Sequence, residues 1–549
     1  MNIAAQELAR ALQTFSSTTR LYELILGDGG RTPLPAGLLV EAFAADDALD
    51  GIGARDVIVL STSAHIKLES LLGQPGSLEI SLADGTRTRF SGDISEVAML
   101  GTDGGFARYR VRLSPWLWRL GQVRTNRVWQ DKTVIEIVDA VLAAYQPLAV
   151  WRWSDEARPF MATAAVRGYC CQYRESDLDF VRRLLAREGL CWRFEQTGTG
   201  PGMVLFADSS HECAVPEDLS SELDGGIRFH GVSAVERQDS VQALVAQRSL
   251  QVSLATVLSP NYTSKQVSAA SSPSVIRRSS RLPVLESYDV PGQFAYANRK
   301  DAERYADIYM EGQDARALVW HGRSTVRTLR AGTRLVITGA PRKELGDSAA
   351  FTILGVTSLG VNNLPPPARD ALAELFGPIP ELLQEVLVNR PSADTAQAIS
   401  RAIESGYANC FEAIPAECPW RPQLPGSDGR SNVKPTAFGA QSAIVIGPDG
   451  SDLPRGADEL YCDRLGRVRM RFHWQDSGAA SCWVRVAQRS AGGGMGCQFL
   501  PRIGQEVLVQ FLENDIDRPI IVEALYNGQG EGGIAPTPGV RRDATSNTS

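Results

Sequence analysis

Three carboxylates lie within five residues of one another near the C-terminal end of the chain, at Glu513, Asp515 and Asp517. Acidic side chains at this spacing could ligate Ca²⁺ or supply the acid and base of a glycosidase. The cluster lies between two apolar segments, however, and it lacks the glycine that an EF-hand loop has at its sixth position. We therefore expect a solvated hairpin turn, in which Arg518 offsets part of the charge, and no metal or catalytic site.

A second candidate is a segment in which polar and apolar side chains alternate. The polar set is Arg467, Arg469, Arg471 and His473, and the apolar set is Val468, Met470, Phe472 and Trp474. This period of two is typical of a half-buried strand. His473 could act as a base, but no Ser, Cys or acid stands beside it at a useful spacing, which favours a structural role. The arginines could bind nucleic acid, yet their face carries no aromatic residue for base stacking, so we favour a contact between subunits.

No other motif predicts catalysis or a bound cofactor. The chain has no Gly-x-Ser-x-Gly elbow, no His-Glu-x-x-His pair and no P-loop. The glycine-rich segment 492–496 lacks the strand-then-helix context of a phosphate loop and is interpreted as a barrel loop. Nine cysteines include no Cys-x-x-Cys pair and five histidines are scattered, which indicates reduced structural thiols and no zinc. We expect no catalytic residue, no cofactor and no metal.

Length and composition indicate an ordinary multidomain protein. A chain of 549 residues is too long for one core and suggests about three or four domains. A net charge of −7 argues against a broad basic face for nucleic acid. No apolar run reaches the roughly 18–20 residues that span a bilayer, and the N-terminus does not resemble a signal peptide. We therefore expect assembly in the cytoplasm and no stable insertion into a membrane.

Short strands must position most of these residues. In the C-terminal part, segments 482–487, 506–512 and 519–526 follow the alternating segment, and together they predict a small closed barrel of OB type. Further strands are predicted at 38–43, 57–60, 78–82, 109–113, 332–339 and 350–356. Turn residues separate the first four, which favours an antiparallel barrel or sheet. The serine-rich segment 264–280 is predicted to be a surface loop.

Helices are predicted at four places. Thr133 and Glu136 form a capping-box pattern before a helix with apolar residues at helical spacing. A second helix begins after Ser176 and ends at Gly189, where glycine can adopt a left-handed conformation. A third covers 300–310. The pattern from 368 to 405 is helical with a break at 377–380, and it follows three prolines that we expect to end a barrel.

Several of these segments resemble the VgrG family, the spike proteins of bacterial type VI secretion. The N-terminal half contributes segments 115–118, 127–131, 172–181 and 187–190. The C-terminal part contributes 411–416, 421–422 and 439–448, and then six ordered matches at 466–468, 472–474, 482–486, 501–507, 515–520 and 526–528. The matching residues that we single out are Tyr173, Arg174, Glu175, Asp179, Phe180, Gly466, Arg467, Phe472, His473, Trp474, Trp483, Arg485, Pro501, Gly504, Glu506, Asp517, Arg518, Pro519, Tyr526 and Asn527. Asn514 and segment 522–524 depart from the family pattern, which usually has glycines there.

The resemblance implies a mainly β, multidomain fold with a few helices. Two phage-tail-hub-like β-barrels are followed by an OB-fold barrel in an obligate trimer, whose C-terminal β-helix needle is absent or truncated in this chain. The domains expected are a first barrel over 1–120, a helical and β insert over 121–225, a second barrel over 226–364, a connector over 365–430, the OB barrel over 431–530 and a flexible tail over 531–549.

The resemblance also implies partners and a function. A homotrimer would cap the Hcp tube with its N-terminal ring, puncture target envelopes on sheath contraction and carry effectors into the target cell. Its other partners would be baseplate proteins and, toward the C-terminus, a PAAR-type tip protein, a chaperone or adaptor, or an Rhs-type effector. The alternatives are a phage-like tail hub with cell-wall hydrolase activity and an OB module that binds oligosaccharide or nucleic acid.

Overall fold

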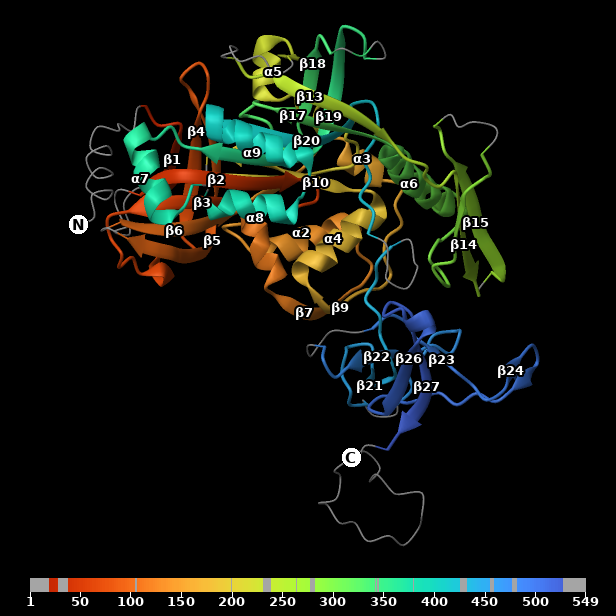
Figure 1. The fold of residues 1–549 in the computed structure, drawn as a ribbon. Helices are drawn as coiled ribbons and strands as arrows, with labels where there is room; N and C mark the ends of the chain where they lie inside the picture. Colours follow the sequence, from red (N-terminus) through yellow and green to blue (C-terminus); the bar gives the residue numbers. More distant parts are fainter. Residues whose placement is uncertain are drawn as a thin grey trace.

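The computed structural model describes residues 19–27, 38–103, 106–198, 200–230, 238–262, 264–276, 282–340, 342, 345–378, 380–424, 432–454, 459–475 and 481–526. Figure 1 shows a broad body, coloured from red to cyan, above a small blue barrel made by the C-terminal strands. We call the broad body the hub and the small one the OB barrel. Within the described residues no helix is long and apolar enough to cross a membrane.

The first hub barrel is an antiparallel sheet in the order β1, β4, β5, β6, β3, β2. Its elements are β1 (Tyr22–Leu26), β2 (Leu39–Ala48), β3 (Ala54–Ser61), η2 (Leu68–Ser70), β4 (Pro75–Ser81), β5 (Arg87–Asp103) and β6 (Phe106–Ser114). The four strands predicted in this region are confirmed as β2, β3, β4 and β6. Strand β5 has two shifts of register against β6, and these bulges interrupt the alternation by which its sequence would predict a strand.

One buried side chain closes this barrel between β1 and β2. Asn362 is only 2% exposed, and its Nδ2 donates to the carbonyl oxygens of Tyr22 (3.2 Å) and Val40 (2.8 Å). Its Oδ1 accepts from the backbone N–H of Leu21 at 3.2 Å. Because a carboxamide carries both donors and an acceptor, it replaces the direct backbone pairing that β1 and β2 do not make.

The second hub barrel is continuous with the first through the pairing of β2 with β19. Its strands are β12 (Ile227–Arg228), β13 (Val241–Arg248), β17 (Leu318–Ser324), β18 (Arg334–Thr338), β19 (Ser348–Val361) and β20 (Tyr407–Pro415). A bridge between Phe229 and Val241 completes the ring. At the seam the residue opposite Phe43 is Gly360, where a Cβ would lie 2.1 Å from the Phe43 ring, so the close approach of the barrels requires glycine.

The segment between the barrels contains two of the four predicted helices. It comprises η3 (Trp116–Gly121), β7 (Arg124–Trp129), α2 (Val134–Ala143), β8 (Trp151–Trp153), α3 (Ala157–Met161), β9 (Cys170–Ser176), α4 (Asp177–Glu188), β10 (Cys191–Thr197), β11 (Gly200–Phe206) and α5 (Leu219–Asp224). The capping box of Thr133 and Glu136 is confirmed, and α4 begins after Ser176 and ends at Gly189, whose φ is 72°. The nine cysteines, which all lie in the described residues, form no disulfide bond there.

The prediction of a surface loop over 264–280 is wrong for its described part. Strand β15 (Gln266–Pro273) pairs with β14 (Leu254–Asn261), which also pairs with β16 (Glu286–Asp289). The helix predicted at 300–310 is α6 (Arg299–Ala317), and Ala270 of β15 is buried in the same cluster as Ala302 and Ala306 of α6. The small side chains that suggested a loop instead let a helix pack closely on the sheet (Figure 1).

The helices predicted over 368–405 are confirmed as α7 (Pro366–Phe376), α8 (Glu381–Asn389) and α9 (Ala393–Ser405). Their position differs from the predicted connector over 365–430. They cover the hub sheet, and strand β20 then pairs between β19 and β17 inside the hub. The prolines that we expected to end the barrel begin α7 instead, because proline fits the first helical turn. Only the chain after β20 passes to the OB barrel.

The OB barrel has five strands in the order β22, β21, β26, β27, β23. They are β21 (Gln441–Ile446), β22 (Arg469–Phe472), β23 (Arg485–Val486), β26 (Glu506–Phe511) and β27 (Pro519–Leu525), and η5 (Leu512–Asn514) follows β26. Paired hydrogen bonds between Val468 and Val484 close the ring. The predicted alternation is confirmed, because Val468, Met470 and Phe472 are buried. The glycine-rich loop forms the exposed hairpin of β24 (Ala491–Gly492) and β25 (Met495–Gly496), which extends from the barrel (Figure 1).

Candidate functional site: the junction of the hub and the OB barrel

Strand β9 of the hub contributes side chains to the core of the OB barrel. Tyr169, Cys171 and Tyr173 alternate along this part of the chain and belong to the same buried cluster as Phe472. The Tyr173 hydroxyl accepts a hydrogen bond from Gln441 Nε2 at 2.9 Å, and its ring lies 5.8 Å from that of Trp474. The predicted motif residues Tyr173, Phe472 and Trp474 are therefore brought together although they come from distant parts of the sequence.

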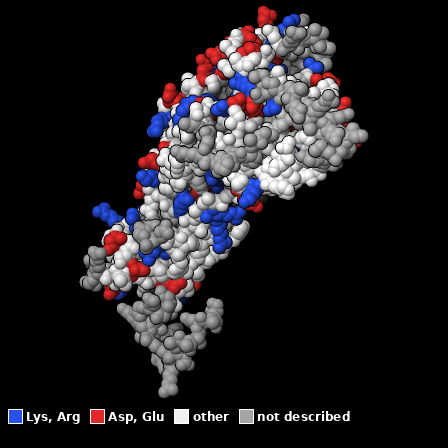
Figure 2. Space-filling model, turned by 90° about the vertical axis from the view of Figure 1, so that its left-hand side faces the viewer, with Lys and Arg blue, Asp and Glu red and all other residues white. Residues whose placement is uncertain are grey.

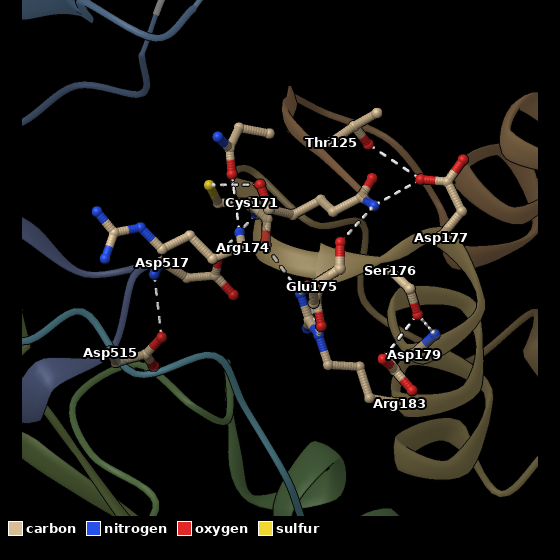
Figure 3. Close-up of polar contacts among 12 residues, drawn as sticks. Thr125, Cys171, Arg174, Glu175, Ser176, Asp177, Asp179, Arg183, Asp515 and Asp517 are labelled. Atoms are coloured by element: carbon tan, nitrogen blue, oxygen red, sulfur yellow. Dashed lines mark hydrogen bonds and ion pairs between the residues drawn. The ribbon is translucent and has the colours of Figure 1, made fainter. Parts of the chain in front are cut away.

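The backbone of Cys171 is held from both sides. Its N–H donates to Asp517 Oδ1 of the OB barrel at 2.7 Å, and its carbonyl oxygen accepts from Arg183 Nη2 of α4 at 2.8 Å. Figure 3 shows Cys171 between these two side chains. Because edge strands have unpaired backbone groups that must find partners when buried, the two side chains fix β9 between helix α4 and the OB barrel.

Arg183 also forms an ion pair with Glu175. Three hydrogen bonds of 3.0, 2.8 and 2.7 Å join its Nε and Nη2 to the Glu175 carboxylate. Burial raises the pKa of Glu175 while Arg183 opposes the rise. Burial also disfavours the charge of Arg183, but the carboxylate outweighs this effect and its pKa is raised. The bidentate geometry keeps both groups ionised and aims the guanidinium at Cys171.

The residues around Arg174 show why the chain turns here. Arg174 has a φ of 52°, in the left-handed region, and its N–H donates to Asn126 Oδ1 at 2.8 Å. The opposite strand β7 has a shift of register between Thr125 and Arg127, beside this contact. The side chain of Arg174 is exposed and stacks 5.1 Å from the Tyr173 ring. This bulge directs the chain from β9 into α4.

The most heavily bonded residue of the motif is Asp177, which is not among the residues predicted from the sequence. Its carboxylate is fully buried and accepts from Thr125 Oγ1 (3.0 Å), Gln172 Nε2 (2.7 Å), Arg127 Nη2 (3.0 Å) and Tyr145 Oη (2.8 Å). Its position in the first turn of a helix suggested only an interaction with the helix dipole. The polar Thr-x-Arg spacing in β7 is the signal that could have indicated a buried partner.

The other predicted residues of this motif complete the start of α4. Ser176 caps the helix by accepting from the Asp179 N–H at 3.0 Å, and its hydroxyl donates to Asp179 Oδ2 at 2.6 Å. Phe180 is fully buried in the core formed by α2, α4 and η3. Asp179 therefore belongs to a capping interaction, and Phe180 anchors the helix in the hub.

The acidic turn joins β26 and β27 as the predicted hairpin and Glu513 is exposed, but the turn is only partly solvated. Asp515 is 3% exposed and Asp517 is 7% exposed, because this end of the turn packs against β9. Lys434 Nζ lies 2.6 Å from Asp515 Oδ2, and the N–H of Asp517 donates to Asp515 Oδ1 at 3.0 Å. Lys434 therefore offsets the charge of Asp515 together with the predicted Arg518. In the described part of the chain no group of three or more His, Cys, Asp or Glu side chains could hold a metal ion.

The Asp515–Lys434 pair predicts a response to acid. Burial opposes ionisation, but Lys434 and Arg518 outweigh it and lower the pKa of Asp515 to about 2, while burial also lowers the pKa of Lys434 below its usual range. Because the folded-state pKa lies below the unfolded value, ionised Asp515 contributes stability above about pH 4, and this is lost as the pH falls toward 2. We expect the difference in unfolding free energy between the wild type and Asp515→Asn to shrink by about 1 kcal/mol between pH 5 and pH 3.

That difference is measured by urea unfolding of both proteins at each pH. Glu513→Gln, which removes a carboxylate from the exposed part of the same turn, is the control for the loss of one negative charge. A difference for Asp515→Asn that stays constant or grows on acidification would contradict the assignment.

Predicted residues of the OB barrel that face the hub also make contacts across the junction. Arg518 Nη2 donates to the Phe294 carbonyl oxygen at 2.7 Å, and the Arg485 guanidinium lies 4.0 Å from the centre of the Tyr262 ring. Pro519 opens β27 beside Arg518 and pairs with Phe511. The hub and the OB barrel therefore meet at both β9 and the segments around 262 and 294.

The remaining predicted residues stabilise the OB barrel itself. Gly466 (φ 68°) and Gly504 (φ 86°) adopt left-handed conformations in turns. Arg467 pairs with Asp463 at 2.6 Å, Trp483 lies 5.1 Å from Tyr461, and His473 Nε2 is 3.8 Å from Glu506 Oε1, too far for a hydrogen bond. Pro501 is buried, Tyr526 is exposed, and Asn527 lies outside the described residues.

Two family models match the chain. The model described as phage tail baseplate hub (GPD) matches residues 47–364, and the model described as type VI secretion system/phage-baseplate injector OB domain matches residues 458–526. The two matches cover most of the hub barrels, without β1 and β20, and most of the OB barrel. The predicted fold class, hub-like β-barrels followed by an OB barrel, is thereby confirmed.

Curated relatives match over nearly the whole chain. The type VI secretion system spike protein VgrG1b of Pseudomonas aeruginosa is 29% identical over 505 residues, which cover 91% of this chain and 60% of that protein. The spike protein VgrG1a of the same organism is 28% identical, with 90% and 68% covered. The chain therefore spans about three fifths to two thirds of the length of these relatives.

Solved structures share the fold. One is an Escherichia coli component of the type VI secretion system, described as similar to the T4 bacteriophage tail proteins gp27 and gp5. It superposes with a TM-score of 0.58 at 20% sequence identity, and the alignment covers 92% of this chain and 100% of that chain. The lidded Francisella PdpA–VgrG complex gives a TM-score of 0.57 at 8% identity, with 95% and 73% covered. At these identities the likeness concerns the fold alone.

Proposed function

The chain belongs to the phage tail baseplate hub family, as a VgrG-type member, and from this premise we propose that it is the base of a type VI secretion spike. Its work in this proposal is mechanical, because the hub and the OB barrel must pass on a load without separating. The observation that carries the proposal is the shared core at the junction, in which side chains of β9 pack among those of the OB barrel. Buried contacts of this kind resist shear better than a flexible linker.

In this proposal three copies form the working unit. Their hubs form a ring that caps the Hcp tube, and their OB barrels lead toward the tip. Exposed apolar side chains on the OB barrel support a contact between copies, since Met495 and Phe499 are 72% and 76% exposed. Large apolar side chains gathered on one surface commonly mark interaction sites. Baseplate proteins bind the assembled ring, and a PAAR-type tip protein, adaptor or Rhs-type effector binds toward the OB end.

In this proposal the protein is assembled in the bacterial cytoplasm and is injected when the sheath contracts. Charges of both signs are spread over the face seen in Figure 2, which gives nucleic acid no broad basic surface there. Some relatives have enzymatic names, such as the actin cross-linking toxin VgrG1 of Vibrio cholerae, of which 33% matches this chain at 29% identity. We assign no catalytic step to the present residues, and any enzyme activity would need groups that the junction does not bring together.

The mass in solution tests the proposal. We expect light scattering of the purified chain to give a trimer near three times 59.5 kDa. The substitution Phe499→Asp places a charge on the exposed apolar surface and should shift the mass toward the monomer. Val275→Asp, at a hub position that is 87% exposed, is the matched control and should leave the mass unchanged. A wild-type monomer at every concentration would contradict the trimer.

A further inference from the structure

A cleft of about 460 Å³ lies between the hub and the OB barrel. The hub residues that line it include 165–169, 293–295 and 297, and the OB residues include 467, 469, 482, 483, 485 and 517–519. Seven cationic side chains line the cleft and only three carboxylates do. The excess of positive charge is local, because the chain as a whole has a net charge of −7.

Three of the cleft arginines are positioned by uncharged groups. The guanidinium of Arg469 lies 5.0 Å from the centre of the Trp483 ring, and that of Arg485 lies 4.0 Å from Tyr262. Arg518 donates to a backbone carbonyl oxygen at 2.7 Å. By contrast, Arg471 on the same strand as Arg469 pairs with Asp452 at 3.0 Å and does not line the cleft. Stacking holds Arg469 and Arg485 in place without neutralising their charge, whereas Asp515 offsets part of the charge of Arg518.

Buried polar atoms without a partner also lie in this cleft. The hydroxyl of Tyr169, a residue only 8% exposed, and Nε of Arg469 have no hydrogen-bond partner in the described chain. Both need an acceptor. Gln293 Oε1 and Asp301 Oδ1, which line the same cleft, are buried and lack a partner too, and both need a donor. Leaving such groups unpaired is unfavourable, so their concentration in one cleft indicates a ligand site.

We propose that this cleft binds an acidic peptide segment of a partner protein. Carboxylates of the peptide accept from Arg469, Arg485 and Arg518 and from the Tyr169 hydroxyl, while its backbone N–H groups donate to Gln293 and Asp301. Sulfate, a simple anion without O–H groups, satisfies the first set but has no donor for the second. The peptide therefore matches the mixed requirement of the cleft, which sulfate does not, and guanidinium groups suit planar carboxylates. This binding goes beyond the proposed spike function and does not depend on it.

Fluorescence anisotropy of the full-length chain with labelled hexaglutamate tests the proposal, with hexaglutamine as the uncharged probe. We expect Arg469→Gln and Arg485→Gln each to weaken hexaglutamate binding by about tenfold, whereas the matched control Arg471→Gln changes it less than about twofold. Equal binding of the two probes by the wild type would overturn the proposal. So would an effect of Arg471→Gln as large as that of Arg469→Gln, because attraction would then be general.

Tyr169→Phe separates binding from folding. The substitution removes a hydroxyl that has no partner among the described residues, so the melting temperature should not fall, while hexaglutamate binding should weaken about threefold or more. Unchanged binding in Tyr169→Phe would overturn the role of the cleft. If inorganic phosphate displaces the peptide at a phosphate concentration near the dissociation constant of the peptide, the cleft is a site for simple anions. That result would overturn the peptide assignment. A changed mass for Arg469→Gln would place the cleft between copies of this chain, which also contradicts a partner peptide.

Discussion

Asp177→Ala should destabilise the junction more than any other single substitution in the predicted motif. The change removes a buried carboxylate that accepts four hydrogen bonds, from the buried Gln172 and from the half-buried Thr125, Tyr145 and Arg127. Removing one partner from a buried, charge-assisted network lowers the free energy of unfolding by about 3–5 kcal/mol. Hydrogen exchange of the backbone amides in β7 and β9 measures the effect, and we expect exchange to become about 100- to 1000-fold faster.

The matched control lies two residues away. Asp179→Ala removes a second carboxylate from the same helical turn, but Asp179 is exposed and takes part only in the cap with Ser176. Loss of a capping interaction costs about 1 kcal/mol. If Asp177→Ala and Asp179→Ala change the exchange by the same factor, the four hydrogen bonds do not stabilise the junction as the geometry indicates.

Local sequence patterns were sufficient to predict most helices and strands, but they did not predict which distant residues these elements contact. The alternation around Phe472 and the capping box of Thr133 and Glu136 depend on neighbours in the sequence, so both predicted the observed structure. The bonds of Asn362 join residues more than 300 positions apart, and nothing near this asparagine distinguishes it from a surface residue. Long-range polar contacts of this kind follow from the packed fold and cannot be predicted from spacing.

The errors have the same physical origin. The acidic turn has the composition of a solvent-exposed hairpin, and it is buried only because Cys171, 346 residues earlier, needs an acceptor for its N–H. Strand β15 has the composition of a loop, and it is a strand because α6 covers its small side chains. Composition predicts exposure well only where no other element packs on the segment. At the junction two domains meet, and the sequence of either one does not indicate the burial.

Asp517→Ala should loosen the attachment of the OB barrel without unfolding either part. The substitution removes the acceptor of the Cys171 N–H, which belongs to a fully buried residue. A buried donor without an acceptor costs about 1–3 kcal/mol of free energy. We expect this loss to weaken the attachment of the OB barrel and not the barrel itself, because Asp517 is not part of the apolar core of the barrel. Limited trypsin digestion should release an OB fragment roughly 10- to 100-fold faster than from the wild type, while the melting temperatures of the two parts stay close to their wild-type values.

Two further variants separate the hydrogen bond from the charge. Asp517→Asn keeps an oxygen that can accept from Cys171, so the fragment should be released at nearly the wild-type rate. Glu523→Ala removes an exposed carboxylate from β27 and controls for the general loss of negative charge. If Asp517→Asn releases the fragment as fast as Asp517→Ala, the charge rather than the hydrogen bond holds the junction. If neither variant differs from the wild type, the aromatic contact of Tyr173 and Trp474 is sufficient to hold the OB barrel, and a load on the barrel reaches the hub through packing alone.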